Sequence, residues 1–159
     1  MTADERGESL LEVLIAVAIM GIAVVALMAG LTTSIMMSDI HRKQATTGEY
    51  VRDYAEAIES ALTSSTCTSS TPAAGCYKAC SAGSWYENPA GFSVPTGYSR
   101  SVVAGSSKYW NGTSWQSTCG TDTGVQQVTV QVASSDGRAS ERIVVVLRKP
   151  CRMEDSLCG

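Results

Sequence analysis

The chain has 159 residues, a formal net charge of −3 and only 17% charged side chains. Residues 1–31 hold four acidic residues and one basic residue, which leaves 11 acidic and 11 basic residues in the rest of the chain. This balance excludes a strong overall field for nucleic acid or an anionic surface, and the length suits one compact domain with an appendage.

A long apolar run follows a short charged leader. Residues 13–31 contain no charged side chain, and a helix of this length measures about 28 Å, close to the thickness of a bilayer's hydrocarbon core. Apolar side chains surround the helix on all sides, unlike those of an amphipathic surface helix. A cleaved secretory signal would need a basic start, a shorter core and a small-residue exit. We therefore predict a retained membrane helix over residues 8–33.

Six cysteines follow the apolar run, and none lies within it. An even number of cysteines in a Ser/Thr/Gly-rich region predicts disulfides in an oxidising compartment, and six allow 15 pairings. Structural zinc is the poorer alternative, because no paired C-x-x-C occurs and the chain has one histidine. We predict no metal site, and disulfides from the following residues: Cys67, Cys76, Cys80, Cys119, Cys151 and Cys158.

The signals for membrane orientation disagree. The bias of Lys and Arg toward the cytoplasm would place Arg42 and Lys43 there. The cysteines instead place the C-terminal part outside the cell. We give the cysteines more weight, because Arg42 lies more than ten residues beyond the apolar run.

Glu12 is an unexpected acid at the start of the membrane helix. An ionised side chain costs about 2.5–3.5 kcal/mol at the centre of a membrane helix and less near its ends. The plain interpretation is an acid among the lipid head groups. If the chain were cut after Gly7, however, Glu8 would carry a free ammonium one helical turn away. Pairing with the terminus of a neighbouring copy would then set the stagger between helices, which suits a buried ion pair better than adding stability.

The stretch "RGESLLEVLIAVAIMGIAVVA" resembles the N-terminal segment of type IV prepilins and pseudopilins. The matching features are Gly7 at the end of a charged leader, the residues Ser9, Leu10 and Glu12, and the apolar run. The resemblance implies that a membrane peptidase removes residues 1–7 and methylates Glu8, and that Ser9, Leu10 and Glu12 belong to the assembly segment. The best-known members have phenylalanine where this chain has Glu8.

The resemblance also implies partners and a location. These are the prepilin peptidase/methyltransferase, other pilin subunits, the assembly platform and the cytoplasmic membrane. The expected location is a single-pass membrane protein with an exterior C-terminal domain, and then a cell-surface filament. Gly21 resembles the glycine region where pilin helices unwind in filaments, and close helix packing is its alternative explanation.

Residues 34–62 predict an amphipathic continuation of the helix into the exterior domain. Apolar side chains recur at helical spacing, as is typical of a helix that packs on a sheet. Gly48 and the threonines beside it lower the helix propensity. We therefore predict one helix from about Glu8 to Leu62 with a bend or soft spot near Gly48.

The rest of the chain predicts a small α+β domain of the type IV pilin kind. Residues 63–97 are predicted to be a Cys/Ser/Thr-rich loop, residues 98–149 an antiparallel sheet of about four strands, and residues 150–159 a C-terminal Cys loop. The strand signals are "YSRSVVAG", "KYWNGTSWQ", "VQQVTVQVAS" and "RIVVVLRK". Asn111-Gly112 predicts a two-residue hairpin turn. For the disulfides, Cys119–Cys151 is the favoured pair and Cys151–Cys158 its rival.

No catalytic constellation or cofactor motif accompanies these elements, so we predict no enzyme and no cofactor. His41 lies in a charged helical stretch and is expected to be solvated. Basic residues near the C-terminus, with exposed aromatics, would suit nucleic acid. We favour a solvated sheet edge carrying protective charges. The bases concerned are Arg138, Arg142, Arg148, Lys149 and Arg152.

The sequence therefore predicts a structural subunit of a type IV pilus-like filament, cut after Gly7 and polymerised through its N-terminal helix. The alternative is a membrane-anchored exterior binding domain that never polymerises, or a minor pilin that binds DNA or a surface. The anchored-domain alternative predicts an intact leader and no effect of Glu12→Ala.

Overall fold

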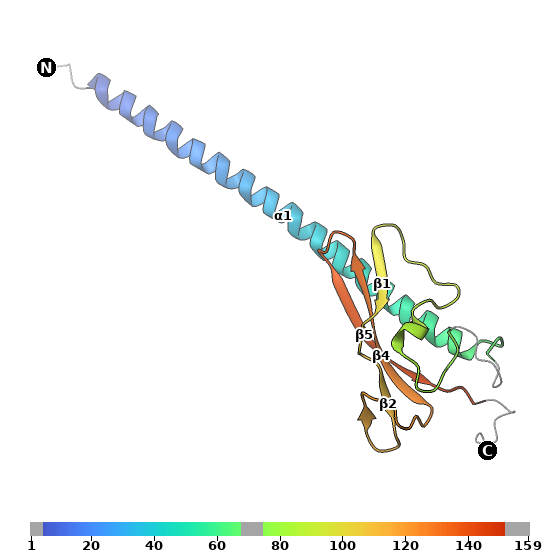
Figure 1. Ribbon diagram of the computed structural model, residues 1–159. Helices are drawn as coiled ribbons and strands as arrows, with labels where there is room; N and C mark the ends of the chain where they lie inside the picture. Colours follow the sequence, from blue (N-terminus) through green and yellow to red (C-terminus); the bar gives the residue numbers. More distant parts are fainter. Residues whose placement is uncertain (1–4, 68–74, 152–159) are drawn as a thin grey trace. The chain divides into compact units, whose positions relative to one another are not determined.

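A computed structural model of the chain describes residues 5–67 and 75–151, with side chains from Leu10 onward. It contains one long helix, α1 (Glu5–Thr63), and one short 3-10 helix, η1 (Gly83–Tyr86). Five strands follow (Figure 1): β1 (Tyr98–Val102), β2 (Lys108–Trp110), β3 (Trp115–Gln116), β4 (Val125–Ser134) and β5 (Ser140–Arg148). The chain divides into two compact units, one ending at His41 and one beginning at Arg42, and each is described by itself.

The first unit is the apolar part of α1. Two threonines near its end satisfy their hydroxyl groups by hydrogen bonds to the helix backbone. The Thr32 hydroxyl donates to the Met28 carbonyl oxygen at 3.0 Å, and the Thr33 hydroxyl donates to the Ala29 carbonyl oxygen at 3.0 Å. The polar end of the segment thus remains helical.

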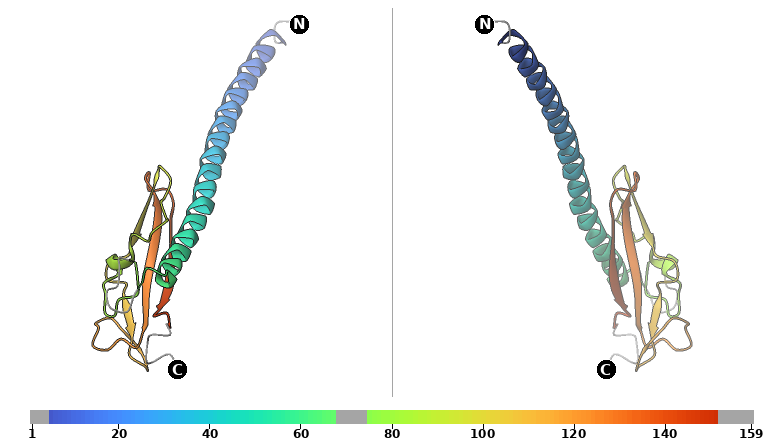
Figure 2. Two further views of the ribbon diagram at one scale, coloured as in Figure 1. Left: turned by 90° about the vertical axis from the view of Figure 1, so that its right-hand side faces the viewer. Right: turned by 90° about the vertical axis from the view of Figure 1, so that its left-hand side faces the viewer.

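The second unit is built around β4, which pairs antiparallel on both of its edges. One edge pairs with β5 over nine residue pairs, from Val125↔Arg148 to Ala133↔Ser140. The other edge pairs with β1 along its C-terminal half and with β2 along its N-terminal half. β3 completes a short hairpin with β2. Figure 2 shows the last turns of α1 beside β5, within the second unit.

Strict alternation along β4 separates the two faces of the sheet. Every second residue of "VQQVTVQVAS" is buried, beginning at Gln126. The valines on this buried face pack with α1 residues such as Tyr54 and Ile58 and with β5 residues such as Leu147. The buried face of β4 and the apolar face of α1 therefore pack together in one core. This confirms the predicted α+β class, with a helix packed on an antiparallel sheet.

Loop 75–97 adds aromatic side chains to the same core. The Tyr54 ring stacks on Phe92 with centroids 5.2 Å apart, and the Tyr54 hydroxyl donates to the Glu87 carbonyl oxygen at 2.8 Å. Gly83 approaches the sheet so closely that a Cβ there would lie 2.6 Å from Val102 Cγ1. A larger residue at Gly83 would therefore push η1 away from β1.

The predicted hairpin in "KYWNGTSWQ" is confirmed, but its predicted two-residue turn is wrong. Trp110 pairs with Trp115, so four residues connect β2 and β3. Asn111 closes this loop with its side chain, because Asn111 Oδ1 accepts from the backbone N–H groups of Thr113 and Ser114 at 2.9 and 2.8 Å. Gly112 has φ +103°, which suits glycine. The same Asn-Gly pair thus forms a side-chain-capped loop.

The favoured disulfide Cys119–Cys151 is also wrong. The structure pairs Cys80 with Cys119 and Cys67 with Cys76. Cys119 faces loop 75–82 because the chain turns back toward that loop between β3 and β4. The rival pair Cys151–Cys158 involves a residue outside the described part of the chain.

Candidate functional site

The N-terminal segment carries the residues that the sequence singles out for processing. α1 begins at Glu5, so the Gly7–Glu8 peptide bond and Ser9 belong to its first turns. Leu10 and Glu12 follow on the same helix with exposed side chains. These residues are successive positions of one helix. Any recognition of this segment therefore needs a second molecule.

The apolar part of α1 has no cover within the described chain. Of the 20 exposed large hydrophobic side chains among the described residues, 17 lie between Leu10 and Met37. The most apolar 18-residue window has a mean hydropathy of 2.8 and no buried residue. By length and composition this helix could cross a membrane, although signal sequences and soluble core helices meet the same criterion. Its complete exposure distinguishes it from a core helix, and such a surface needs lipid or other apolar helices around it.

Gly21 and Gly48 both lie within the continuous helix. A Cβ built on either glycine would meet no atom within 4 Å. Neither glycine is therefore needed for close packing inside the described chain. A role in helix flexibility stays a prediction for both positions.

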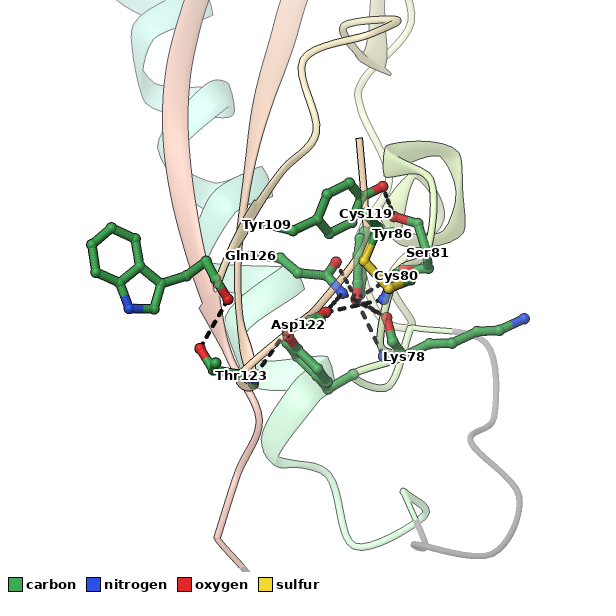
Figure 3. The surroundings of a disulfide bond; sticks show 12 residues. Lys78, Cys80, Ser81, Tyr86, Tyr109, Cys119, Asp122, Thr123 and Gln126 are labelled. Carbon is green, nitrogen blue, oxygen red and sulfur yellow. Dashed lines mark hydrogen bonds between the residues drawn. A yellow bond between two sulfur atoms is a disulfide. The ribbon is translucent and has the colours of Figure 1, made fainter. Parts of the chain in front are cut away.

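A second cluster joins three parts of the second unit next to the Cys80–Cys119 disulfide (Figure 3). Asp122 lies at its centre and accepts four hydrogen bonds. Asp122 Oδ1 accepts from the Tyr77 hydroxyl at 2.6 Å and from the Gly124 N–H at 2.8 Å. Asp122 Oδ2 accepts from the Cys80 N–H at 3.0 Å and from Gln126 Nε2 at 2.6 Å. One carboxylate thus fastens loop 75–82 to the start of β4.

Buried hydroxyl groups extend this cluster into the core. Gln126 is fully buried and donates a second hydrogen bond from Nε2 to the Lys78 carbonyl oxygen at 2.7 Å. Its Oε1 accepts from the Tyr86 hydroxyl at 3.1 Å, and the Tyr109 hydroxyl donates to the Ser81 carbonyl oxygen at 2.9 Å. The described residues contain no buried side-chain nitrogen or oxygen without a hydrogen bond. A satisfied polar network of this kind fixes one loop arrangement.

The charges in the cluster follow from these contacts. Burial opposes ionisation of Asp122, but the hydrogen bonds from Tyr77, Cys80, Gln126 and Gly124 outweigh it and lower the pKa of this carboxyl group. Burial, and then the hydrogen bond to Asp122, raise the pKa of the Tyr77 phenol. Burial likewise raises the pKa of Tyr86. At neutral pH the cluster therefore contains one carboxylate and neutral phenols.

The cluster offers little to a metal ion. The sulfur atoms of Cys80 and Cys119 and a carboxylate oxygen of Asp122 lie within 4.8 Å of one another. Both sulfurs are joined in the disulfide, so neither is the thiolate that zinc prefers. The carboxylate oxygens already accept four hydrogen bonds. The cluster is therefore a structural anchor for loops.

The basic residues near the C-terminus do not all lie on one surface. Arg142 and Arg148 lie exposed on the outer face of β5. Arg138 Nε lies 3.8 Å from Asp136 Oδ2 in the turn between β4 and β5. Arg152 lies outside the described residues. His41 is exposed at the end of the first unit.

The sequence-based predictions did not include Asp122 and Gln126. A signal for Asp122 was present, because Asp followed two residues later by Gly is typical of an Asx turn, and Gly124 has φ +92°. Gln126 has no comparable signal. Its burial depends on the Tyr86 and Lys78 groups that the disulfide-bonded loop brings to it.

Residues 2–28 match the family described as the prokaryotic N-terminal methylation motif. Comparisons with curated proteins and with solved structures find no significant match to this chain. The matched range contains the proposed cleavage position, Glu12 and most of the exposed apolar segment. The N-terminal segment thus carries the type IV prepilin signature, and the chain continues into a domain of the pilin-like α+β type.

Proposed function

We propose that this chain is the precursor of a structural subunit of a type IV pilus-like filament. A prepilin peptidase removes residues 1–7 and methylates the new N-terminal Glu8. The subunit then leaves the membrane and polymerises through α1, while the second unit is displayed outside the cell. Catalysis has no part in this role.

The observation that carries the proposal is the match of the methylation motif to a helix whose apolar side chains are exposed throughout. A lipid bilayer would cover this surface before assembly, and neighbouring copies of the same helix would cover it afterwards. The packed helices of a filament exclude water, so the Glu12 carboxylate needs a cation there. The ammonium of Glu8 on a neighbouring copy supplies one after cleavage.

The processing step is tested by intact mass and N-terminal sequencing of the protein from its native membrane and sheared surface fractions. We expect a chain that begins at Glu8 and is heavier by one methyl group. A Gly7→Leu variant is the matched control and should keep its leader. A wild-type chain that still begins at Met1 or Thr2 would favour the alternative, a membrane-anchored domain that does not polymerise.

The assembly step is tested with Glu12→Ala. We expect cleavage to continue and filament yield to fall about tenfold or more, because the neighbouring ammonium would lose its partner in a dry environment. Glu59→Ala removes an exposed acid from the domain part of α1 and should leave the filament yield unchanged. Normal filaments from Glu12→Ala would contradict the assembly role.

A further inference from the structure

The outer face of β5 carries apolar side chains that nothing in the described chain covers. Its four outward side chains form a strip, with valines in the middle and a base at each end: Arg142, Val144, Val146 and Arg148. Val144 is 53% exposed and Val146 is 42% exposed. The solvated face of an antiparallel sheet is normally polar, so two adjacent exposed valines depart from that pattern. We call this surface the β5 strip.

The bases of the β5 strip remain available for a partner. Arg142 Nε donates to Gln131 Oε1 at 2.8 Å, which holds the guanidinium against the outer face and leaves its other N–H groups for further bonds. Arg148 makes no hydrogen bond or ion pair to the described residues. The strip spans six residue steps, or about 20 Å along the strand.

An acidic groove lies on the other side of the sheet, between α1 and the start of β5. It has a volume of about 580 Å³, and its lining residues are Gln44, Ala45, Gly48, Glu49, Arg52, Asp53, Glu56 and Glu141. Four of these residues are acidic and one is basic. The acids on the helix are exposed, and they form no ion pair within the described chain. We call this surface the helix groove.

The helical part of the groove and the β5 strip have similar lengths. Ala45 and Gly48 leave space at the N-terminal end of the groove, and a Cβ at Gly48 would meet no atom within 4 Å. The three helical acids, Glu49, Asp53 and Glu56, follow these small residues along the helix and face the bases of the strip. The helical part of the groove, from Gln44 to Glu56, is about 18 Å long and so close to the length of the strip.

One copy of the chain cannot bring its own strip and groove together. The odd-numbered residues of β5, such as Val145 and Leu147, face α1 and are buried in the core. The strip residues alternate with them and point away from the helix. A contact between strip and groove therefore joins two copies through different surfaces, and such a head-to-tail contact repeats without closing unless its rotation closes a ring.

We propose that the β5 strip of one copy docks into the helix groove of the next copy, with Arg142 and Arg148 paired to Glu49, Asp53 and Glu56. This inference rests on the proposed filament function and names the exterior surfaces that join its subunits. Opposite charges set the register of the two domains, and burial of Val144 and Val146 removes apolar surface from water.

The test measures the yield of sheared surface filaments in the native cells, with the chromosomal copy of the full chain replaced by each variant. The strip variant is R142E/R148E and the groove variant is E49K/D53K. The third variant combines all four substitutions and so restores opposite charges with the signs exchanged. The control, E59K/E87K, reverses two acids that do not line the groove. Membrane levels of each variant show whether the subunit accumulates.

We expect the strip and groove variants each to lower the filament yield about tenfold, and the combined variant to restore most of it. The control should match the wild type. Recovery in the combined variant would also show that the single-surface variants fold. If only the strip variant loses filaments, its partner is another molecule, such as nucleic acid or a lipid head group, and the proposal is overturned.

Two other results would overturn the proposal. Unchanged yields in the strip and groove variants would show that both surfaces remain solvated in the filament. Loss in both without recovery in the combined variant would show that the two surfaces do not pair. Absence of the wild-type chain from filaments would instead contradict the proposed function, so the two failures are distinguishable.

Discussion

At Asp122, four hydrogen-bond donors converge on one partly buried carboxylate. Two of the donors are the backbone N–H groups of Cys80 and Gly124. In these loops the carboxylate accepts the backbone hydrogen bonds that a helix or strand would otherwise satisfy. Hydrogen bonds to an ionised acceptor are stronger than those between neutral groups. Together with Gln126 and the Cys80–Cys119 disulfide, this side chain therefore holds loop 75–82 in place.

Asp122→Asn should destabilise the domain by about 2 kcal/mol, because an amide NH₂ would replace one of the two acceptor oxygens and face donors it cannot accept from. Thermal or urea unfolding of the purified full chain in detergent, followed by tryptophan fluorescence, measures this change. Glu59→Gln is the control, since Glu59 is exposed and makes no hydrogen bond to the described residues. Equal stability of the two variants would contradict the role given to Asp122.

The same carboxyl group should make stability depend on pH. Its folded-state pKa lies below the ordinary value, so its contribution is complete above about pH 4 and is lost as the pH falls through the folded-state pKa. Unfolding measured down this range should show the wild type converging on Asp122→Asn. A difference in unfolding free energy between the two proteins that stays constant across that pH range would contradict the prediction.

Residue-scale features were the hardest to predict from the sequence. The Asx turn at Asp122 was readable from local spacing, whereas the partners of Gln126 come from a loop more than 35 residues away. Cysteine pairing failed for the same reason. The strand order suggests Cys151, after β5, as the disulfide partner of Cys119. The path of loop 75–82 instead brings Cys80 to Cys119.

The two disulfides of the described chain differ in exposure, and this difference predicts the order of their reduction. Cys67 and Cys76 are buried, with exposures of 5% and 3%, whereas Cys80 is exposed. Thiol exchange requires access to a sulfur atom, so a mild reductant should open Cys80–Cys119 first. Alkylation followed by mass spectrometry of the peptides should label Cys80 and Cys119 before Cys67 and Cys76. The reverse order would contradict the burial assigned to these residues.

At the scale of elements, periodicity was a reliable guide. The strand propensity of "VQQVTVQVAS" predicted β4 at its observed bounds, and the helical spacing of apolar residues predicted that this part of α1 packs on the sheet. The weak points were short segments. β2 and β3 have only three and two residues, and their loop follows the Asn111 side chain, which strand propensity does not describe.

Ile58→Ala should destabilise the second unit by about 2–5 kcal/mol, because Ile58 is 1% exposed and contacts the β4 and β5 side chains of the core. Ile35→Ala is a matched control on the same helix, since Ile35 is 70% exposed. Denaturant unfolding of the full chain in detergent should separate the two variants clearly. Equal midpoints would mean that α1 does not stabilise the sheet.

At the scale of the whole molecule, the two units differ in the surface that they present. The first unit exposes an apolar helix that only lipid or similar helices can cover. The second unit buries its apolar residues in one core and presents charged and polar side chains, apart from a few positions such as Val144 and Val146. A single helix passes through both units, so the same element carries the exposed apolar segment and one layer of the second unit's core.

This division predicts that a charge in the first unit will affect membrane integration without affecting the fold of the second unit. Ile19→Arg places a guanidinium near the middle of the apolar run, at a cost of about 2.5–3.5 kcal/mol on insertion scales. Extraction of native membranes at alkaline pH should release this variant while the wild type stays in the pellet. The Cys67–Cys76 and Cys80–Cys119 disulfides should still form in variant molecules that reach the exterior, because Ile19 lies outside the second unit. Full retention of Ile19→Arg in the membrane would mean that other contacts, and not the apolar run, anchor the chain.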